Sequence, residues 1–220
     1  MLSQNITATN PLLLTNRNEN ALTPEGVEAV RRAARKLLKG VDEPTLIEFS
    51  LAASSIDTAK IVGSELNMGN NRIRAEFTNL DPRALGLWDG LDRSTVIDAV
   101  MAMDYDEAGE LGTGLISRPP ENEDGTPHEV LNNQAIRLRQ FISVLETSFS
   151  GDTILLVFPD GIGPGVLTAM MGGLPLNRVH ELELSPGEIR LNLTPESAKA
   201  LLPPIPSKES MERIERGRIE

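Results

Sequence analysis

Apolar residues recur at two spacings along the chain, and segments with these two spacings alternate. Short apolar runs are typical of buried strands, and they stand at residues 11–15, 44–50, 71–77 and 152–158. Apolar positions three and four residues apart predict amphipathic helices at residues 24–39, 54–66, 94–103 and 129–148, with a short one at 165–173. The alternation predicts a mostly parallel sheet with helices on both faces, a three-layer α/β/α sandwich.

The first predicted helix has start and stop signals at its two ends. Thr23 is a favourable N-cap, and Pro24 stands at the first helical position. Glu25 faces the positive end of the helix dipole, and Gly40 ends the helix. Because ligands of open parallel sheets bind beyond the carboxyl ends of the strands, the turns after residues 15, 49 and 158 are candidate site positions.

The C-terminal part of the chain departs from this alternation. Residues 180–194 alternate polar and apolar side chains on both sides of Ser185-Pro186-Gly187, which predicts a hairpin or an edge strand pair. Residues 204–220 are rich in proline and then charged. We expect a single domain over residues 1–203, followed by a tail that forms a solvated helix or becomes ordered on a partner.

The composition limits the chemistry that the chain can perform. There is no cysteine, which excludes disulfides, thiolate nucleophiles and cysteine-ligated metals. With only 2 histidines and no spacing like that of a calcium loop, we predict no metal. The glycine-rich segment 159–165 contains Pro159 and Pro164, which lack the backbone donors that would hold a phosphate, so we predict no nucleotide cofactor.

The overall charge is strongly acidic, with a net charge of −11 and a pI near 4.8. An acidic surface repels phosphate backbones, so we expect no nucleic-acid partner. No apolar run reaches the roughly 18 residues of a membrane span, and the N-terminus lacks the basic start and apolar centre of a secretory signal. We expect a soluble protein, in the cytoplasm or in an organelle reached after removal of a transit peptide.

Five segments in order along the chain resemble one family. They are LLLTNRNENALTPEG at 12–26, FSLAASSIDTAKIVGSEL at 49–66, LGLWDGL at 85–91, Glu129 with Arg137 eight residues later, and GDTILLVFPDG at 151–161. Together they resemble the histidine phosphatase superfamily, the phosphoglycerate-mutase-like proteins. The resemblance implies the phosphoglycerate-mutase-like form of the α/β/α sandwich.

The resemblance also implies a chemistry. In the family, a neutral imidazole attacks phosphorus and becomes a phosphohistidine. Two arginines and a second histidine bind the phosphoryl oxygens and stabilise the charge of the transition state. A carboxyl group protonates the leaving oxygen.

The first motif of this chain lacks the residues of that chemistry. Asn16 stands where the family has an arginine, Arg17 where it has the nucleophilic histidine, and Asn18 where it has a glycine. A shift of one residue would place Asn16 at the histidine, so neither alignment restores the nucleophile. Arginine stays protonated in proteins, which excludes Arg17 as a nucleophile.

The other motifs are altered as well. Ser54 stands at the second arginine and Pro159 at the second histidine, and Asp160 follows as a carboxylate that would repel phosphate. Only Glu129, at the position of the general acid, matches the family. The sequence therefore predicts a degenerate pocket formed by Asn16, Arg17, Asn18, Ser54, Glu129, Pro159 and Asp160, with no catalytic residue.

These observations support three hypotheses. The first is a pseudoenzyme that serves as a structural or regulatory subunit and binds other protein subunits. The second is a non-catalytic binder of a small anionic or phosphorylated metabolite, held by Arg17, Ser54 and Glu129. The third is an enzyme with new chemistry that uses Glu129, Asp160 and His128, and it is disfavoured because no nucleophile with an adjacent base is evident.

Several single residues have a plain structural interpretation beside a functional one. Arg17 pairs with Glu129 across the pocket or is a solvated turn residue. His180 is expected to be a capping or surface residue, and Trp88 is expected to pack beneath the rim of the sheet. The acidic segment 119–125 is a flexible loop or a docking loop.

Overall fold

The computed structural model describes residues 2–3, 21–38, 43–107, 128–191 and 194–218. In this part of the chain, four parallel strands form a sheet in the order β1-β4-β2-β3. The strands are β1 (Leu2–Ser3), β2 (Leu46–Ser50), β3 (Ile73–Glu76) and β4 (Ile154–Phe158). The register pairs Phe49 with Val157, so β2 and β4 end at the same edge of the sheet.

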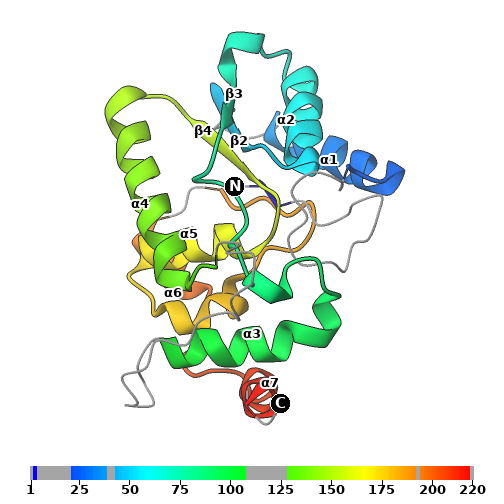
Figure 1. Cartoon of the computed structure of the whole chain (residues 1–220). Helices are drawn as coiled ribbons and strands as arrows, with labels where there is room; N and C mark the ends of the chain where they lie inside the picture. The colour runs from blue at the N-terminus through cyan, green and yellow to red at the C-terminus, as the bar shows by residue number, and fades with distance from the viewer. Residues whose placement is uncertain (1, 4–20, 39–42, 108–127, 192–193, 219–220) are drawn as a thin grey trace.

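Helices cover both faces of this sheet. Figure 1 shows α1 and α2 on one side and α4 and α5 on the other, with further helices at one end. The α-helices are α1 (Pro24–Leu37), α2 (Ala53–Glu65), α3 (Arg93–Glu107), α4 (Leu131–Ser148), α5 (Ile162–Gly172), α6 (Pro195–Ala200) and α7 (Lys208–Gly217). The 3₁₀ helices are η1 (Asn70–Arg72), η2 (Gly86–Trp88) and η3 (Leu176–Leu182). The predicted three-layer α/β/α arrangement is confirmed.

The start of α1 is as the sequence predicts. The Thr23 hydroxyl accepts a hydrogen bond from the Gly26 amide at 3.0 Å, and Pro24 occupies the first helical position. Val30 and Leu37 are buried on one face of the helix. The helix therefore has a satisfied N-cap, and along its length it packs an apolar stripe against the core.

Alternating side chains of the strands build two separate cores. Ile47 and Val157 belong to the core beneath α1 and α2, whereas Leu156 and Phe158 belong to the core beneath α4 and α5. Phe158 is 1% exposed. Because neighbouring side chains of a strand point to opposite faces, one apolar run of five residues supplies both cores.

A smaller layer of helices lies beyond the sheet. Trp88 packs against Leu85 and against buried residues of α3 such as Val96. The expected packing role of this tryptophan is therefore confirmed. The charged tail forms α7, whose Ile214 is buried against Met101 of α3. The helix in the tail is confirmed, and one of its faces packs on α3 instead of being solvated. The boundary at residues 203–204 stays a prediction.

The predicted hairpin at residues 180–194 is wrong within the described residues. His180 lies in η3, and Leu182 and Leu184 are buried without forming a strand pair. The Leu182 carbonyl instead accepts a hydrogen bond from Arg190 at 3.0 Å. The alternation reflects two buried leucines, Leu182 at the end of η3 and Leu184 just after it. The turn itself is present, because the Glu188 amide donates to the Ser185 carbonyl at 3.0 Å.

Some predictions fall outside the described residues. These are the strand at 11–15, the degenerate turn with Asn16, Arg17 and Asn18, the helix stop at Gly40, and the acidic segment 119–125. In the described part, the two residues of β1 pair with Val157 and Phe158 of β4. No helix among the described residues is both long and apolar enough to cross a membrane.

The close packing of Gly161 yields a test of the fold. A Cβ at Gly161 would collide with the Leu184 carbonyl oxygen, which is backbone and cannot swing away. We expect Gly161→Ala to lower the free energy of unfolding by about 1–3 kcal/mol, as overpacking does, in urea denaturation. Gly69→Ala is the control, because its Cβ meets only the flexible Asn71 side chain, at 2.9 Å. Equal stability of the two variants would contradict this packing.

Candidate functional site

The candidate site lies at the carboxyl ends of β2 and β4. Ser54 is in the first turn of α2, just after β2, and its residue is 3% exposed. Pro159 and Asp160 follow β4 directly and precede α5. Glu129 lies just before α4. The described residues of the predicted pocket thus come from turns at one edge of the sheet, as expected for a parallel sheet.

The end of β2 carries a buried hydrogen bond that the sequence did not suggest. The Ser50 hydroxyl donates to Asp81 Oδ1 at 3.1 Å and accepts from the Ala52 amide at 3.1 Å. Ser50 is fully buried and Asp81 is 6% exposed. The pair links β2 to the chain that follows β3, so it positions the turn leading to Ser54.

Glu129 is held by an arginine of α4, the helix that follows it. Arg137 Nε donates to Glu129 Oε1 at 3.2 Å, and Arg137 Nη2 donates to Oε2 at 3.3 Å. The Ala84 amide donates to Oε2 at 3.2 Å, and the Glu129 amide donates to the Ala84 carbonyl at 2.8 Å. Both carboxylate oxygens therefore face donors from the protein. The predicted partner Arg17 lies outside the described residues. In the described part of the chain, Glu129 forms its ion pair with Arg137.

Arg137 also holds the loop after β3. Its Nη1 donates to the carbonyls of Asn79 at 2.6 Å and Thr78 at 3.0 Å. Its Nη2 donates to the carbonyls of Asp81 at 2.8 Å and Pro82 at 3.3 Å. A planar guanidinium with donors on three nitrogens can satisfy several carbonyls at once, which a lysine cannot.

Asp160 occupies an acidic environment. Its Oδ1 accepts a hydrogen bond from the Gly163 amide at 2.9 Å, at the start of α5. Burial raises the pKa of Asp160 above its ordinary value, the Gly163 hydrogen bond lowers it, and the negative charge of Glu183 raises it. The positive charges of Arg93 and Arg137 act on it too weakly to reverse the shift. Arg93 is itself paired with Glu183, with 2.6 Å between Nη2 and Oε2.

The two histidines lie in different settings. His128 is partly buried, and its backbone bridges to Leu85 in an antiparallel pair. The side chain of His180 is 6% exposed, with Nε2 at 2.6 Å from Asp104 Oδ2, and Arg83 Nη2 donates to the same oxygen at 2.8 Å. The expectation of a surface or capping role for His180 is therefore wrong. Its ring is part of a buried ionic cluster.

The sequence did not indicate the buried pair of Arg83 and Asp104, because charged residues are expected at the surface. Asp104 is completely buried, and burial alone would raise its pKa, but Arg83 and His180 together hold the pKa of this carboxyl below its ordinary value. The available signal was a lone aspartate at the end of the apolar run Val100–Met103, on the face that α3 buries. A carboxylate in such a place needs buried cationic partners.

The described residues offer few groups for a metal or a cofactor. No group of three or more histidine, aspartate or glutamate side chains among them is arranged to hold a metal ion. The structure brings Glu129, Arg137, Asp160, Arg93 and Glu183 to the same edge of the sheet, with Ser54 at the neighbouring strand end. In the described residues, this edge contains the ion pairs Arg93–Glu183 and Arg137–Glu129, and the Asp160 carboxyl that accepts from the Gly163 amide.

Comparison with known proteins identifies the fold. A structure of a mycobacterial glucosyl-3-phosphoglycerate phosphatase matches with a TM-score of 0.60 and 22% identity, over 81% of this chain and 80% of that one. A putative α-ribazole-5′-phosphate phosphatase from Escherichia coli matches with a TM-score of 0.57 and 20% identity, over 84% and 85%. The product of open reading frame Rv3214 from Mycobacterium tuberculosis matches with a TM-score of 0.60 and 17% identity, over 84% and 85%.

The chain has the fold of the histidine phosphatase superfamily, the phosphoglycerate-mutase-like α/β/α sandwich. Searches with protein-family models and against curated protein sequences give no match. The structural likeness spans most of the chain, whereas the sequence identity is low. The fold that the sequence motifs predicted is thus confirmed by structural similarity.

The cluster around Arg137 predicts a large effect of one substitution. Arg137→Met leaves Glu129 and several carbonyls without a donor, so we expect the free energy of unfolding to fall by about 2 kcal/mol or more. Arg137→Lys should recover only part of the loss, because one ammonium cannot reach all the acceptors. Arg139→Met, at an exposed position of the same helix, is the control. Urea denaturation measures all three, and similar losses at Arg137 and Arg139 would contradict the structural role.

The environment of Asp160 predicts a pH-dependent gain in stability. Asp160→Asn keeps an oxygen for the Gly163 amide and removes the negative charge. Below about pH 3.8 the carboxyl is protonated in both the folded and unfolded states. As the pH rises from there toward the raised pKa, the carboxyl ionises in the unfolded chain but stays protonated in the folded one, so wild type loses stability. The melting temperature of the variant relative to wild type should therefore increase with pH. Calorimetry between about pH 4.5 and 8 checks this, with Glu146→Gln as a surface-charge control. A difference that shrinks with rising pH would refute it.

Proposed function

We propose that this chain is a non-catalytic protein with the histidine phosphatase fold, which acts as a structural or regulatory subunit that docks on other proteins. The observation that carries the proposal is the nature of the side chains at the carboxyl ends of β2 and β4. Phosphoryl transfer through histidine needs a nucleophilic imidazole and positive charge around the phosphate. Ser54, Pro159 and Asp160 supply neither.

The engagement of Glu129 supports the same proposal. A general acid needs a protonated oxygen that faces the leaving group. Both Glu129 oxygens instead accept hydrogen bonds from Arg137, and one also accepts from the Ala84 amide. The residue that matches the family is therefore used to hold the loop after β3 against α4.

The alternative of a small-anion binder has less support. Structures of the mycobacterial phosphatase include complexes with VO3 and with inorganic phosphate. In this chain, a phosphate near the end of β4 would approach Asp160 and Glu183, and the nearby Arg93 is already paired with Glu183. The two described arginines that act on Asp160, Arg93 and Arg137, are each already paired with a glutamate, and Arg17 lies outside the described residues. An enzyme with new chemistry is disfavoured further, because Glu129 is already held by Arg137.

Exposed apolar side chains near the rim support docking. Leu87 is 54% exposed and Leu91 is 44% exposed, on the two sides of Trp88. Exposed apolar side chains can contribute to a docking surface, and the proposal assigns this role to Leu87 and Leu91. These two leucines follow the loop that Arg137 holds, so they project from an ordered part of the molecule.

Two measurements test the proposed function together. With p-nitrophenyl phosphate as substrate, we expect no turnover above the protein-free blank. Tagged protein recovered from cells of the source organism should be part of a complex heavier than the 23.9 kDa monomer. Its partner proteins should be present in a fixed ratio to it. Leu87→Glu with Leu91→Glu should release the partner, whereas Leu201→Glu, at a leucine 45% exposed on another part of the surface, should not. Turnover that Arg17→Ala abolishes, or a chain that is always monomeric, would refute the proposal.

A further inference from the structure

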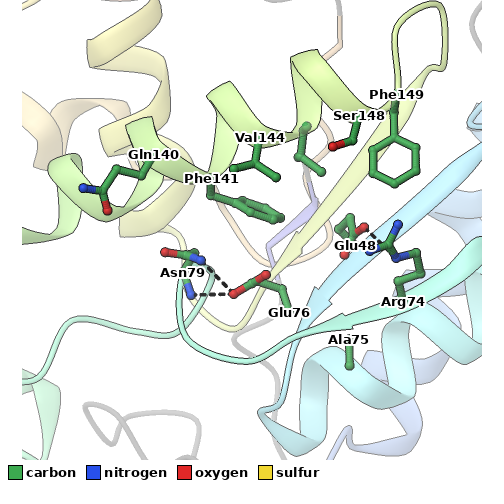
Figure 2. A pocket seen from close by; sticks show the side chains of 11 residues that line it. Glu48, Arg74, Ala75, Glu76, Asn79, Gln140, Phe141, Val144, Ser148 and Phe149 are labelled. Carbon is green, nitrogen blue, oxygen red and sulfur yellow. Dashed lines mark hydrogen bonds and ion pairs between the residues drawn. The ribbon is translucent and has the colours of Figure 1, made fainter.

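A cavity lies between the sheet and the C-terminal half of α4, and it extends to the end of β3 at Glu76 and to Asn79 in the loop that follows. It has a volume of about 440 Å³, which is within the range of small-molecule sites. Figure 2 shows α4 on one side of it and β3 with β2 on the other. Its position results from the order of the strands, because β3 is the edge strand next to β2 in the described sheet.

The two walls of this cavity differ in chemistry. The wall from α4 and the residue after it is mostly apolar, with Phe141, Val144, Leu145 and Phe149 beside the polar Gln140 and Ser148. The wall from β2 and β3 is charged, because Glu48, Arg74 and Glu76 lie on the face of the strands that is turned toward α4. Val144 is 58% exposed, so the apolar wall is accessible from solvent.

Glu48 is the unusual member of the charged wall. It is 2% exposed in the middle of β2, yet its Oε1 accepts no hydrogen bond. Its contact with Arg74 Nε, at 3.2 Å, is an ion pair without hydrogen-bond geometry. A buried carboxylate oxygen without a donor is costly, which makes this atom a candidate to bind a ligand.

The charge balance indicates the sign of that ligand. Two carboxylates, Glu48 and Glu76, share the cavity with one guanidinium, so the wall has one excess negative charge. Burial raises the pKa of Glu48, Arg74 lowers it, and Glu76 raises it again. Arg74 stacks over the Phe149 ring at 4.8 Å and its side chain is 49% exposed, so it can move aside without breaking the core.

We propose that this cavity binds a small organic amine, whose ammonium group donates to Glu48 and whose apolar body packs against Phe141, Val144 and Leu145. The ammonium supplies both the donor that Oε1 lacks and the positive charge that two carboxylates require. The apolar wall supplies contact area and sets the preference for a compact hydrocarbon or aromatic body. The site is separate from the degenerate pocket and does not depend on the proposed docking function.

Matched probes test the charge requirement. Isothermal titration would compare 2-phenylethylamine with the neutral 2-phenylethanol and the anionic 3-phenylpropionate. We expect saturable binding of the amine at one site, with binding of the other two weaker by about tenfold or more. Equal affinities for the amine and the alcohol, or no saturable binding of the amine, would overturn the proposal.

Variants locate the binding. Glu48→Gln should weaken amine binding about tenfold or more, because it removes the charge and keeps the shape. Val144→Trp, at an exposed position, should block the cavity and abolish binding even if Glu48→Gln proves unstable. Glu146→Gln removes an exposed charge of α4 outside the cavity and should leave the affinity unchanged. Amine binding that persists in both cavity variants would overturn the proposal.

Discussion

The guanidinium of Arg137 connects more of this molecule than any other side chain described above. It lies on α4, yet its hydrogen bonds reach the loop after β3 and the carboxylate of Glu129. Without it, the carbonyls of Asn79 and Asp81 would need other donors in a place that water reaches poorly. Arg137 of α4 therefore helps to position the candidate site, because it pairs with Glu129 and donates to backbone carbonyls of the loop after β3. The strands alone do not determine the geometry of the site.

Ion pairs bring together segments that are distant in the sequence. Arg93 and Glu183 join the start of α3 to the chain after η3, and the buried cluster of Arg83, Asp104 and His180 joins the same elements from inside. Each of these arginines faces a carboxylate of the protein. Among the described residues of this edge, the positive charges are thus paired within the protein, and the pKa of the Asp160 carboxyl is raised by burial.

The sequence predicted what depends on local patterns. Apolar periodicity located β2, β4 and α1, and five short motifs indicated the fold that the structural comparisons confirm. It could not predict side-chain pairs formed across the fold. The pairing of Asp104 with Arg83 and His180, and the 3₁₀ helix in place of a strand at Leu182, depend on which surfaces meet. The altered residues of the motifs could be read directly, whereas the binding of Glu129 by Arg137 required coordinates.

The position of Glu129 has a consequence for how such chains change over time. Replacing it would leave Arg137 without its carboxylate and the Ala84 amide without its acceptor, so substitution would be selected against for stability alone. A glutamate at this position can thus persist for as long as the loop needs its partner, whether or not any substrate is turned over. The glutamate of this chain is therefore poor evidence of surviving catalysis.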